Sequence, residues 1–229
     1  MQQGTGAVAA ASTTNVQVTG RAGVPSDAAA AVLNITVTEP SAPGYATVYP
    51  CGSEPPTASN LNYVSGLTVP NLVVSKIGVG GNVCIYTQSG THLVADVAGY
   101  FPAGSTLAPL TPARVLDTRE GGATIDGLGS GAGLQPTGSV TAVRVAGRGG
   151  VPEGARTAVL NVTVTEPGGA GYVTVYPCGI DPPLASNLNF SPGQSVPNAV
   201  LTKIGTNGDV CVFTSQPTHL VVDVNAAFP

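Results

Sequence analysis

The strongest constraint on the fold is an internal repeat. The stretch Val32–Gly52, which begins VLNITVTEP and ends GYATVYPCG, returns as Val159–Gly179, 127 residues later. Residues 20–102 and 147–229 align without a gap and are identical at 50 of 83 positions. A copy of this length can bury a core of its own. The repeat therefore predicts two homologous domains, and the fold of one copy gives the fold of both.

Charge is scarce along the chain. Only 9% of residues are charged, where roughly 25% is typical, and the net charge is −4. The two lysines stand at equivalent positions of the repeat, Lys76 and Lys203. Binding to nucleic acid or to an anionic membrane needs clustered positive charge, so we expect neither partner.

Nothing in the sequence has the pattern of a membrane or targeting segment. No run approaches the ~18 apolar residues of a membrane-spanning helix, and Met1–Gly6 lacks the charged and apolar regions of a signal peptide. We expect a soluble chain without membrane insertion, and we expect any signal peptide to lie outside it.

Each copy of the repeat carries two cysteines. Four cysteines allow three pairings, but the repeat favours Cys51 with Cys84 and Cys178 with Cys211, because each bridge then closes within its own domain. The alternatives are free thiols or a zinc site, and the spacing of the cysteines does not favour zinc. Disulfides are typical of oxidising compartments, so we expect an extracellular or cell-surface location.

Short segments rich in β-branched and aromatic residues predict the secondary structure. In the first copy, Gly and Pro signals separate segments at residues 15–19, 30–39, 45–49, 59–64, 68–77, 82–87 and 92–100. This spacing favours an all-β fold, with two tandem antiparallel β-sandwiches of Ig-like or jelly-roll-like type and one disulfide each. Alternation places Leu33, Ile35 and Val37 on one face of their strand and Thr36 on the other.

The domain boundaries follow from composition. We expect a first repeat at residues 1–102, a Pro-rich linker at 103–113 and a second repeat at 114–229. The second repeat opens with an extended segment that has no counterpart in the first: Arg114, Val115, Leu116, Asp117, Thr118 and Arg119. Either the chain is part of a longer array, or the first repeat takes its opening strand from elsewhere. The donor would be residues 114–119 reaching back, or another chain that polymerises by donor-strand exchange.

Taken together, the motifs RVLDTR, GRGGVP, VLNVTVTEP, GYVTVYPCG, ASNLNF and THLVVDV resemble a tandem module of secreted and cell-wall-associated proteins of high-GC Gram-positive bacteria. The resemblance spans nearly the whole chain. It implies an accessory module without catalytic residues. Two departures are the missing RVLDTR in copy one and the sequence Asn225-Ala-Ala-Phe near the end of copy two.

Catalytic groups are sparse in the sequence. Neither His92 nor His219 stands in a Gly-x-Ser-x-Gly or His-Glu-x-x-His setting. Glu39 and Asp96 could form a carboxylate pair for glycoside hydrolysis, but a Glu-Pro step at a strand end is more simply a turn. We therefore expect a non-enzymatic protein that needs no cofactor and has no metal site.

Binding to cell-wall or extracellular polysaccharide is the main alternative to a structural role. Exposed tyrosines with neighbouring asparagines could stack on sugar rings and hydrogen-bond to them. The candidate glycan-facing residues are Tyr45, Tyr49, Asn60, Asn62, Tyr172, Tyr176, Asn187 and Asn189.

A third hypothesis concerns the two lysines. Lys76 and Lys203 each lie in an apolar strand and could form a Lys–Asn amide cross-link, as in some Gram-positive adhesins. For Lys76 the partner would be Asn34 or Asn62, assisted by Glu39 or Asp96. The sequence as a whole favours a structural or adhesive repeat that spaces or builds a surface array, with other copies of itself or polysaccharide as its partner.

Overall fold

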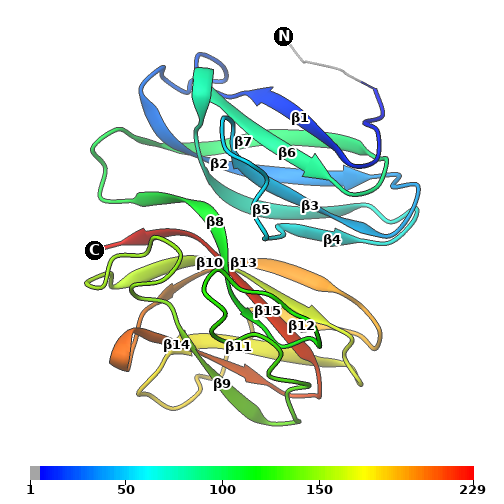
Figure 1. Ribbon diagram of the computed structural model, residues 1–229, viewed down its shortest axis with the longest axis vertical. Helices are drawn as coiled ribbons and strands as arrows, with labels where there is room; N and C mark the ends of the chain where they lie inside the picture. Colours follow the sequence, from blue (N-terminus) through cyan, green and yellow to red (C-terminus); the bar gives the residue numbers. More distant parts are fainter. Residues whose placement is uncertain (1–5) are drawn as a thin grey trace. The chain divides into compact units, whose positions relative to one another are not determined.

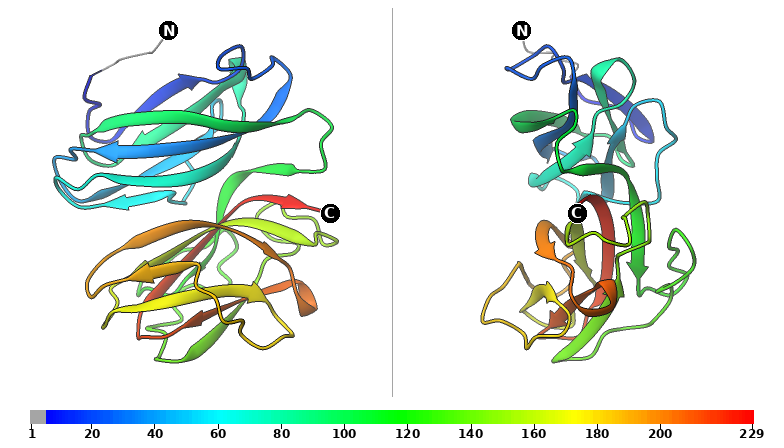
Figure 2. Two further views of the ribbon diagram at one scale, coloured as in Figure 1. Left: turned by 180° about the vertical axis from the view of Figure 1, so that it is seen from behind. Right: turned by 90° about the vertical axis from the view of Figure 1, so that its left-hand side faces the viewer.

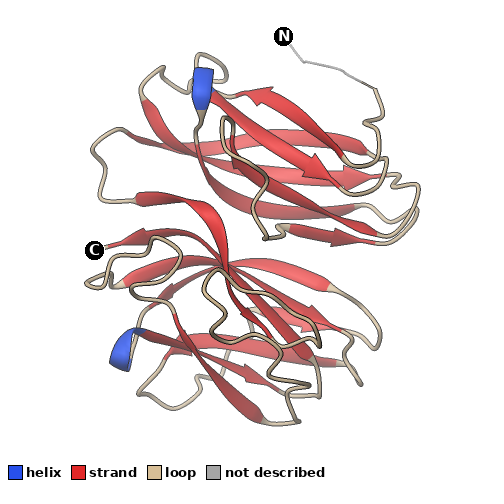
Figure 3. Cartoon of the chain, viewed as in Figure 1, coloured by secondary structure: helices blue, strands red, loops and turns tan. Residues whose placement is uncertain are grey.

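A computed structural model describes residues 6–229, and the expectations for residues 1–5 lie outside it. The described chain is all-β, with four antiparallel sheets and two short 3-10 turns (Figures 1 and 3). It divides after Gly104 into two compact units, here called unit 1 and unit 2. No helix in this part of the chain is long and apolar enough to cross a membrane.

Unit 1 is a sandwich of a four-stranded and a three-stranded sheet. The first has the order β1 (Ser12–Gln17), β6 (Asn82–Thr87), β3 (Gly44–Pro50), β4 (Leu61–Tyr63). The second has the order β5 (Val69–Lys76), β2 (Ala28–Thr38), β7 (His92–Pro102), and the 3-10 turn η1 (Val79–Gly81) precedes β6. These strands match the predicted segments to within a few residues.

Unit 2 repeats this arrangement and adds one strand. Its first sheet has the order β12 (Leu188–Phe190), β11 (Gly171–Pro177), β14 (Asp209–Thr214), β9 (Ser139–Arg144). Its second has the order β13 (Val196–Lys203), β10 (Thr157–Thr165), β15 (His219–Phe228), β8 (Ala108–Asp117), and η2 (Thr206–Gly208) precedes β14.

Each unit buries its own core. Leu33, Ile35 and Val37 of β2 point into the core of unit 1, as the alternation predicts, and Leu160 and Val162 of β10 do the same in unit 2. All five are at most 1% exposed. At ~25 cal/mol per Å², such burial is the main force that holds the two sheets of each sandwich together.

The expected linker is shorter than predicted. Residues 108–113 are not a connector but the first part of β8. Pro109 and Pro112 lack the backbone N–H that a central strand needs, and they are accommodated because β8 lies at the edge of its sheet.

The segment Arg114–Arg119 does not reach back into the first repeat. Its residues 114–117 belong to β8, which pairs antiparallel with β15 of the same unit, with Leu116 opposite Val222. The described part of unit 1 has no strand at this position, so β7 is the edge of its sheet. Figure 2 shows β7 (green) as the outermost strand beside β2 (blue), whereas β8 lies beside β15 (red) in unit 2.

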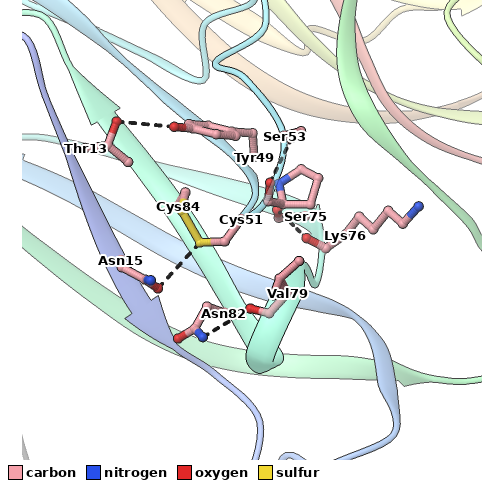
Figure 4. Close-up of a disulfide and its surroundings, with 11 residues drawn as sticks. Thr13, Asn15, Tyr49, Cys51, Ser53, Ser75, Lys76, Val79, Asn82 and Cys84 are labelled. Atoms are coloured by element: carbon pink, nitrogen blue, oxygen red, sulfur yellow. Dashed lines mark hydrogen bonds between the residues drawn. A yellow bond between two sulfur atoms is a disulfide. The ribbon is translucent and has the colours of Figure 1, made fainter.

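Both disulfides close within a unit, which confirms the favoured pairing. Cys51 is bonded to Cys84 and Cys178 to Cys211, each across 33 residues. Each bridge ties the residue after β3 or β11 to the neighbouring strand β6 or β14, and Figure 4 shows the bridge of unit 1.

Candidate functional site

The loop after β3 determines which side chains of that strand reach the surface. Residues 51–60 fold back over the outer face of β3, where Thr47 Oγ1 donates to the carbonyl of Ala58 (2.6 Å) and the Val48 N–H donates to Asn60 Oδ1 (2.7 Å). Unit 2 repeats the second contact, because the Val175 N–H donates to Asn187 Oδ1 at 2.7 Å.

This loop corrects half of the predicted glycan-facing set. Tyr49 and Tyr176 are each 3% exposed. Tyr49 packs against the disulfide, and its hydroxyl lies 3.2 Å from Thr13 Oγ1 (Figure 4). Asn60 is buried, and the side-chain oxygens of Asn60 and Asn187 are occupied by backbone amides. Tyr49, Tyr176 and Asn60 are therefore buried, and Asn187 is half-buried with its side-chain oxygen already bonded.

The other four predicted residues do lie at the surface. Tyr172 is 40% exposed, and its ring centroid is 5.8 Å from that of Phe213. In unit 1, Tyr45 makes the same tilted pair with Tyr86 at 5.8 Å. Asn189 and Asn62 stand directly across the strand pair from Tyr172 and Tyr45, respectively. An aromatic pair with an adjacent amide therefore occurs once in each unit.

In unit 2 this pair forms part of an open groove of about 510 Å³. One wall is the Tyr172–Phe213 pair, and the other is the loop that follows the disulfide cysteine. No charged side chain lines the groove; the lining residues are Tyr172, Thr174, Pro182, Pro183, Leu184, Ala185, Ser186, Asn189 and Phe213. The groove is thus suited to a neutral ligand that presents apolar faces and a few hydroxyl or amide groups.

A buried ion-pair network fixes β8 on β15. Arg114 Nε donates to Asp223 Oδ1 at 2.9 Å, and Arg114 Nη1 donates to Asp117 Oδ2 at 3.1 Å. Arg119 Nη2 donates to Asp117 Oδ2 at 2.7 Å. Arg114 is 8% exposed, and the two aspartates at most 1%. The network locks the strand in register.

The charges in this network stabilise one another. Burial would raise the pKa of Asp117, but hydrogen bonds and attraction from Arg119, together with the charge of Arg114, lower the pKa below its usual value. Burial likewise opposes the charge of Arg114, yet Asp223 and Asp117 raise its pKa. The pKa shifts of Arg114, Asp117 and Arg119 all favour the charged form, so the network acts as a structural clamp.

A second arginine holds the loop that follows β8. Arg148 donates to both carboxylate oxygens of Asp126 (2.7 and 2.6 Å) and to the carbonyls of Val115 (2.8 Å) and Leu128 (2.9 Å). The hydrogen bonds of Arg148 lower the pKa of Asp126 to about 2. This contact was not predicted from the sequence, where the one signal for it is that Arg148 recurs as Arg21.

The histidines and the candidate carboxylates lie in the following surroundings. His92 Nε2 lies 3.9 Å from Glu39, and both side chains are largely exposed. His219 Nδ1 lies 3.1 Å from Thr118 Oγ1 at the end of β8. Asp223, the counterpart of Asp96, is held by Arg114. Within residues 6–229, no three acidic, histidine or cysteine side chains are grouped so that they could hold a metal ion.

Lys76 and Lys203 are both exposed at the ends of their strands. Figure 4 shows the Lys76 side chain directed away from the disulfide. An amide cross-link forms between desolvated groups, so this placement does not favour the Lys–Asn hypothesis. An intact mass lighter by one ammonia per bond would establish it.

Comparisons of the chain with protein-family models, with curated proteins and with solved structures found no match.

Proposed function

We propose that the chain is a non-enzymatic structural and adhesive repeat module of an extracellular surface, where it spaces or displays other parts. One observation carries this proposal: each of the two homologous sandwiches has its own core and its own disulfide. A fold repeated as a complete unit serves an array better than it serves a single active site.

The compartment is inferred from the cysteines. Both disulfides are formed, and Cys51 is 7% and Cys84 9% exposed. Structural disulfides of this kind persist in oxidising surroundings and are rare in the cytosol. The proposal therefore requires an extracytoplasmic location.

The surface loops support resistance to proteases. In unit 1, Asn71 Nδ2 donates to the carbonyl of Asn60 at 2.6 Å, and the Asn60 N–H donates to the carbonyl of Ala46 at 2.9 Å. The loop after the disulfide cysteine is thereby tied to two strands, and a protease must first open a hydrogen-bonded segment.

Fractionation of the native source tests this proposal. An antibody against the chain should detect it at the cell surface or in the medium, and intact-mass analysis should find both disulfides formed. A cytoplasmic protein with four free thiols would overturn it. As a second readout, the oxidised chain should resist trypsin and chymotrypsin for much longer than the reduced chain.

A second candidate function, binding of a neutral polysaccharide, is favoured by the groove of unit 2. The partly exposed ring of Tyr172 offers a face for the C–H groups of a sugar ring, and Asn189 offers both a donor and an acceptor. The absence of charge from the lining favours neutral over acidic glycans.

A glycan array tests this candidate, followed by titration of any hit. Tyr172→Ala should weaken binding by at least about tenfold, since an aromatic stacking surface contributes on the order of 1–2 kcal/mol. Tyr45→Ala is the matched variant in unit 1. If no neutral glycan binds, or if Tyr172→Ala binds as well as the original chain, the glycan candidate falls and the structural proposal is unaffected.

A further inference from the structure

The two units differ at one sheet edge. In unit 2, β15 is covered by β8, and its core-facing residues Leu220, Val222 and Val224 are 0% exposed. Their counterparts on β7 are Leu93, which is half-buried, Ala95, which is exposed, and Val97, which is half-buried. Leu93 and Val97 nevertheless pack against the core of unit 1. The β7 edge thus leaves part of that core open to water.

The same edge lacks its charge partner. Asp223 is 0% exposed and bound by Arg114 of β8. Its counterpart Asp96 is exposed, and no arginine of the described chain forms an ion pair with it. Arg21 of unit 1 corresponds to Arg148 of unit 2, and the two make an equivalent hydrogen bond. Arg21 donates to the carbonyl of Gln17, and Arg148 donates to the carbonyl of Arg144.

We propose that the β7 edge of unit 1 binds an extended segment with the pattern Arg-Val-Leu-Asp-Thr-Arg that is not already seated on a sheet of its own repeat unit. Unit 2 is the template for this complex, because there a segment of this sequence is seated on the homologous edge. By the register of β8 on β15, the arginine faces Asp96 and the leucine faces Ala95.

The docked segment gains three kinds of contact. Its backbone completes the hydrogen bonds that an edge strand leaves unmade. Its apolar residues, which correspond to Val115 and Leu116, cover Leu93 and Val97. Its first arginine reaches Asp96, and Arg21 reaches the carbonyl that corresponds to Val115, to which Arg148 donates in unit 2.

The β8 segment of a second copy is not the expected donor. That segment already pairs with β15 of its own unit, and its removal would expose Leu220, Val222 and Val224. An exchange between copies would therefore open one edge for each edge that it covers. A segment that is not already seated on a sheet has no such cost.

One local difference refines the pattern. Ala22 in unit 1 stands where unit 2 has Gly149, and a Cβ added at Gly149 would lie 2.8 Å from the Cβ of Ala113. The Cβ of Ala22 would therefore crowd an alanine of the docked segment at the position of Ala113. A glycine at that position would avoid this contact.

The test uses the full oxidised chain and a fluorescent synthetic peptide of residues 108–130. Saturable one-to-one binding is expected. Asp96→Ala should weaken binding by at least about tenfold, because a hydrogen bond to a charged group contributes ~1.5–3 kcal/mol. Glu54→Ala, an exposed acidic residue of unit 1 outside β7, is the matched control and should bind unchanged.

The peptide variant Arg114→Ala should lose as much affinity as Asp96→Ala, and the peptide Ala113→Gly should bind more tightly.

A second protein variant tests the backbone contacts. In unit 2, the N–H and the carbonyl of Leu220 both bond to Thr118 at the β8 edge. Because backbone groups alternate along a strand, the N–H and the carbonyl of Val222 point toward the same edge. Ala95 is the counterpart of Val222, so its backbone groups point toward the open edge of β7. Ala95→Pro removes one outward donor and should abolish peptide binding. An intact Cys51–Cys84 disulfide and a retained cooperative unfolding transition of unit 1 will show that the variant is folded.

Hydrogen exchange locates the peptide. Protection should appear at residues 92–102 of β7. Protection at residues 219–228 instead would mean exchange with β8, and concentration-dependent dimers of the chain alone with β7 protected would mean that a second copy covers the edge. Either result overturns the proposal, as does the absence of binding or full binding by both Asp96→Ala and Ala95→Pro.

Discussion

Arg114 and Asp223 form a two-point ion pair across 109 residues of sequence. Arg114 Nε donates to Asp223 Oδ1 at 2.9 Å and Arg114 Nη2 to Asp223 Oδ2 at 3.3 Å, and both side chains are buried. The pair fixes the first strand of unit 2 against its last strand. The equivalent aspartate of unit 1 stands exposed, so the chain contains its own control for what this pair contributes.

Loss of the ion pair should destabilise unit 2 alone. Asp223→Asn leaves the buried Arg114 with only Asp117, which Arg119 also binds, as a counter-charge. We expect the free energy of unfolding of unit 2 to fall by about 3–5 kcal/mol. Asp96→Asn should change that of unit 1 by less than about 0.5 kcal/mol. Urea unfolding followed by hydrogen exchange and mass spectrometry resolves the two units. Equal effects of the two substitutions would contradict this prediction.

Removal of a disulfide should lower the stability of its own unit. A loop of 33 residues corresponds to about 3–4 kcal/mol in the chain-entropy model. We expect the double substitution Cys51→Ala, Cys84→Ala to cost unit 1 this amount and to leave unit 2 unchanged. The double variant of Cys178 and Cys211 should show the converse. Denaturant unfolding of both variants beside the original chain is the measurement.

Gly205 should tolerate no side chain. A Cβ at this position would lie 2.1 Å from the carbonyl oxygen of Cys178, because the turn before η2 passes directly over the disulfide loop, where the Thr206 N–H donates to that carbonyl at 2.8 Å. Gly205→Ala should cost unit 2 at least about 3 kcal/mol, since backbone must move.

The matched control lies in the same unit. A Cβ at Gly154 would meet no atom within 4 Å, so Gly154→Ala should be close to neutral. Comparable thermal unfolding temperatures for the two glycine variants would contradict the close approach of Gly205 to the carbonyl of Cys178.

Acid should weaken unit 2 through Asp126. Its folded pKa of about 2 lies below the usual 3.8, so the ion pair with Arg148 contributes its full stability above pH 3.8 and loses it as the pH falls toward 2. The pKa of Asp117 is also lowered, so its protonation at low pH removes further stability from unit 2. Urea unfolding between pH 5 and 2 should show a smaller pH dependence for Asp126→Asn, and an unchanged slope would contradict the pairing.

The local pattern of the sequence predicted most of the fold. The alternation around Leu33 and Ile35 identified the core face, and the positions of Cys51 and Cys84 in the repeat identified the bridge. These predictions held because they depend on neighbours along a strand or on the comparison of the two copies.

The remainder depends on contacts between distant segments. Tyr49 has the alternation of a surface residue, yet it is buried because it packs against the disulfide between Cys51 and Cys84. Pro109 and Pro112 have the composition of a linker, yet they belong to an edge strand. No periodic pattern in the sequence predicts the contact between Arg114 and Asp223, which are 109 residues apart. The groove at Tyr172 likewise depends on the position of the loop after Cys178, which the sequence pattern does not predict.

The placement of each disulfide has a mechanical consequence. A chain pulled at its two ends transmits tension through the bond between Cys51 and Cys84, so the 33-residue segment that the bond encloses, with β4 and β5, carries no load. At roughly 3.3–3.6 Å per extended residue, about 110 Å of contour length per unit stays hidden from stretching. Each unit is therefore expected to yield in a short extension step, which lengthens only after the sulfurs are reduced.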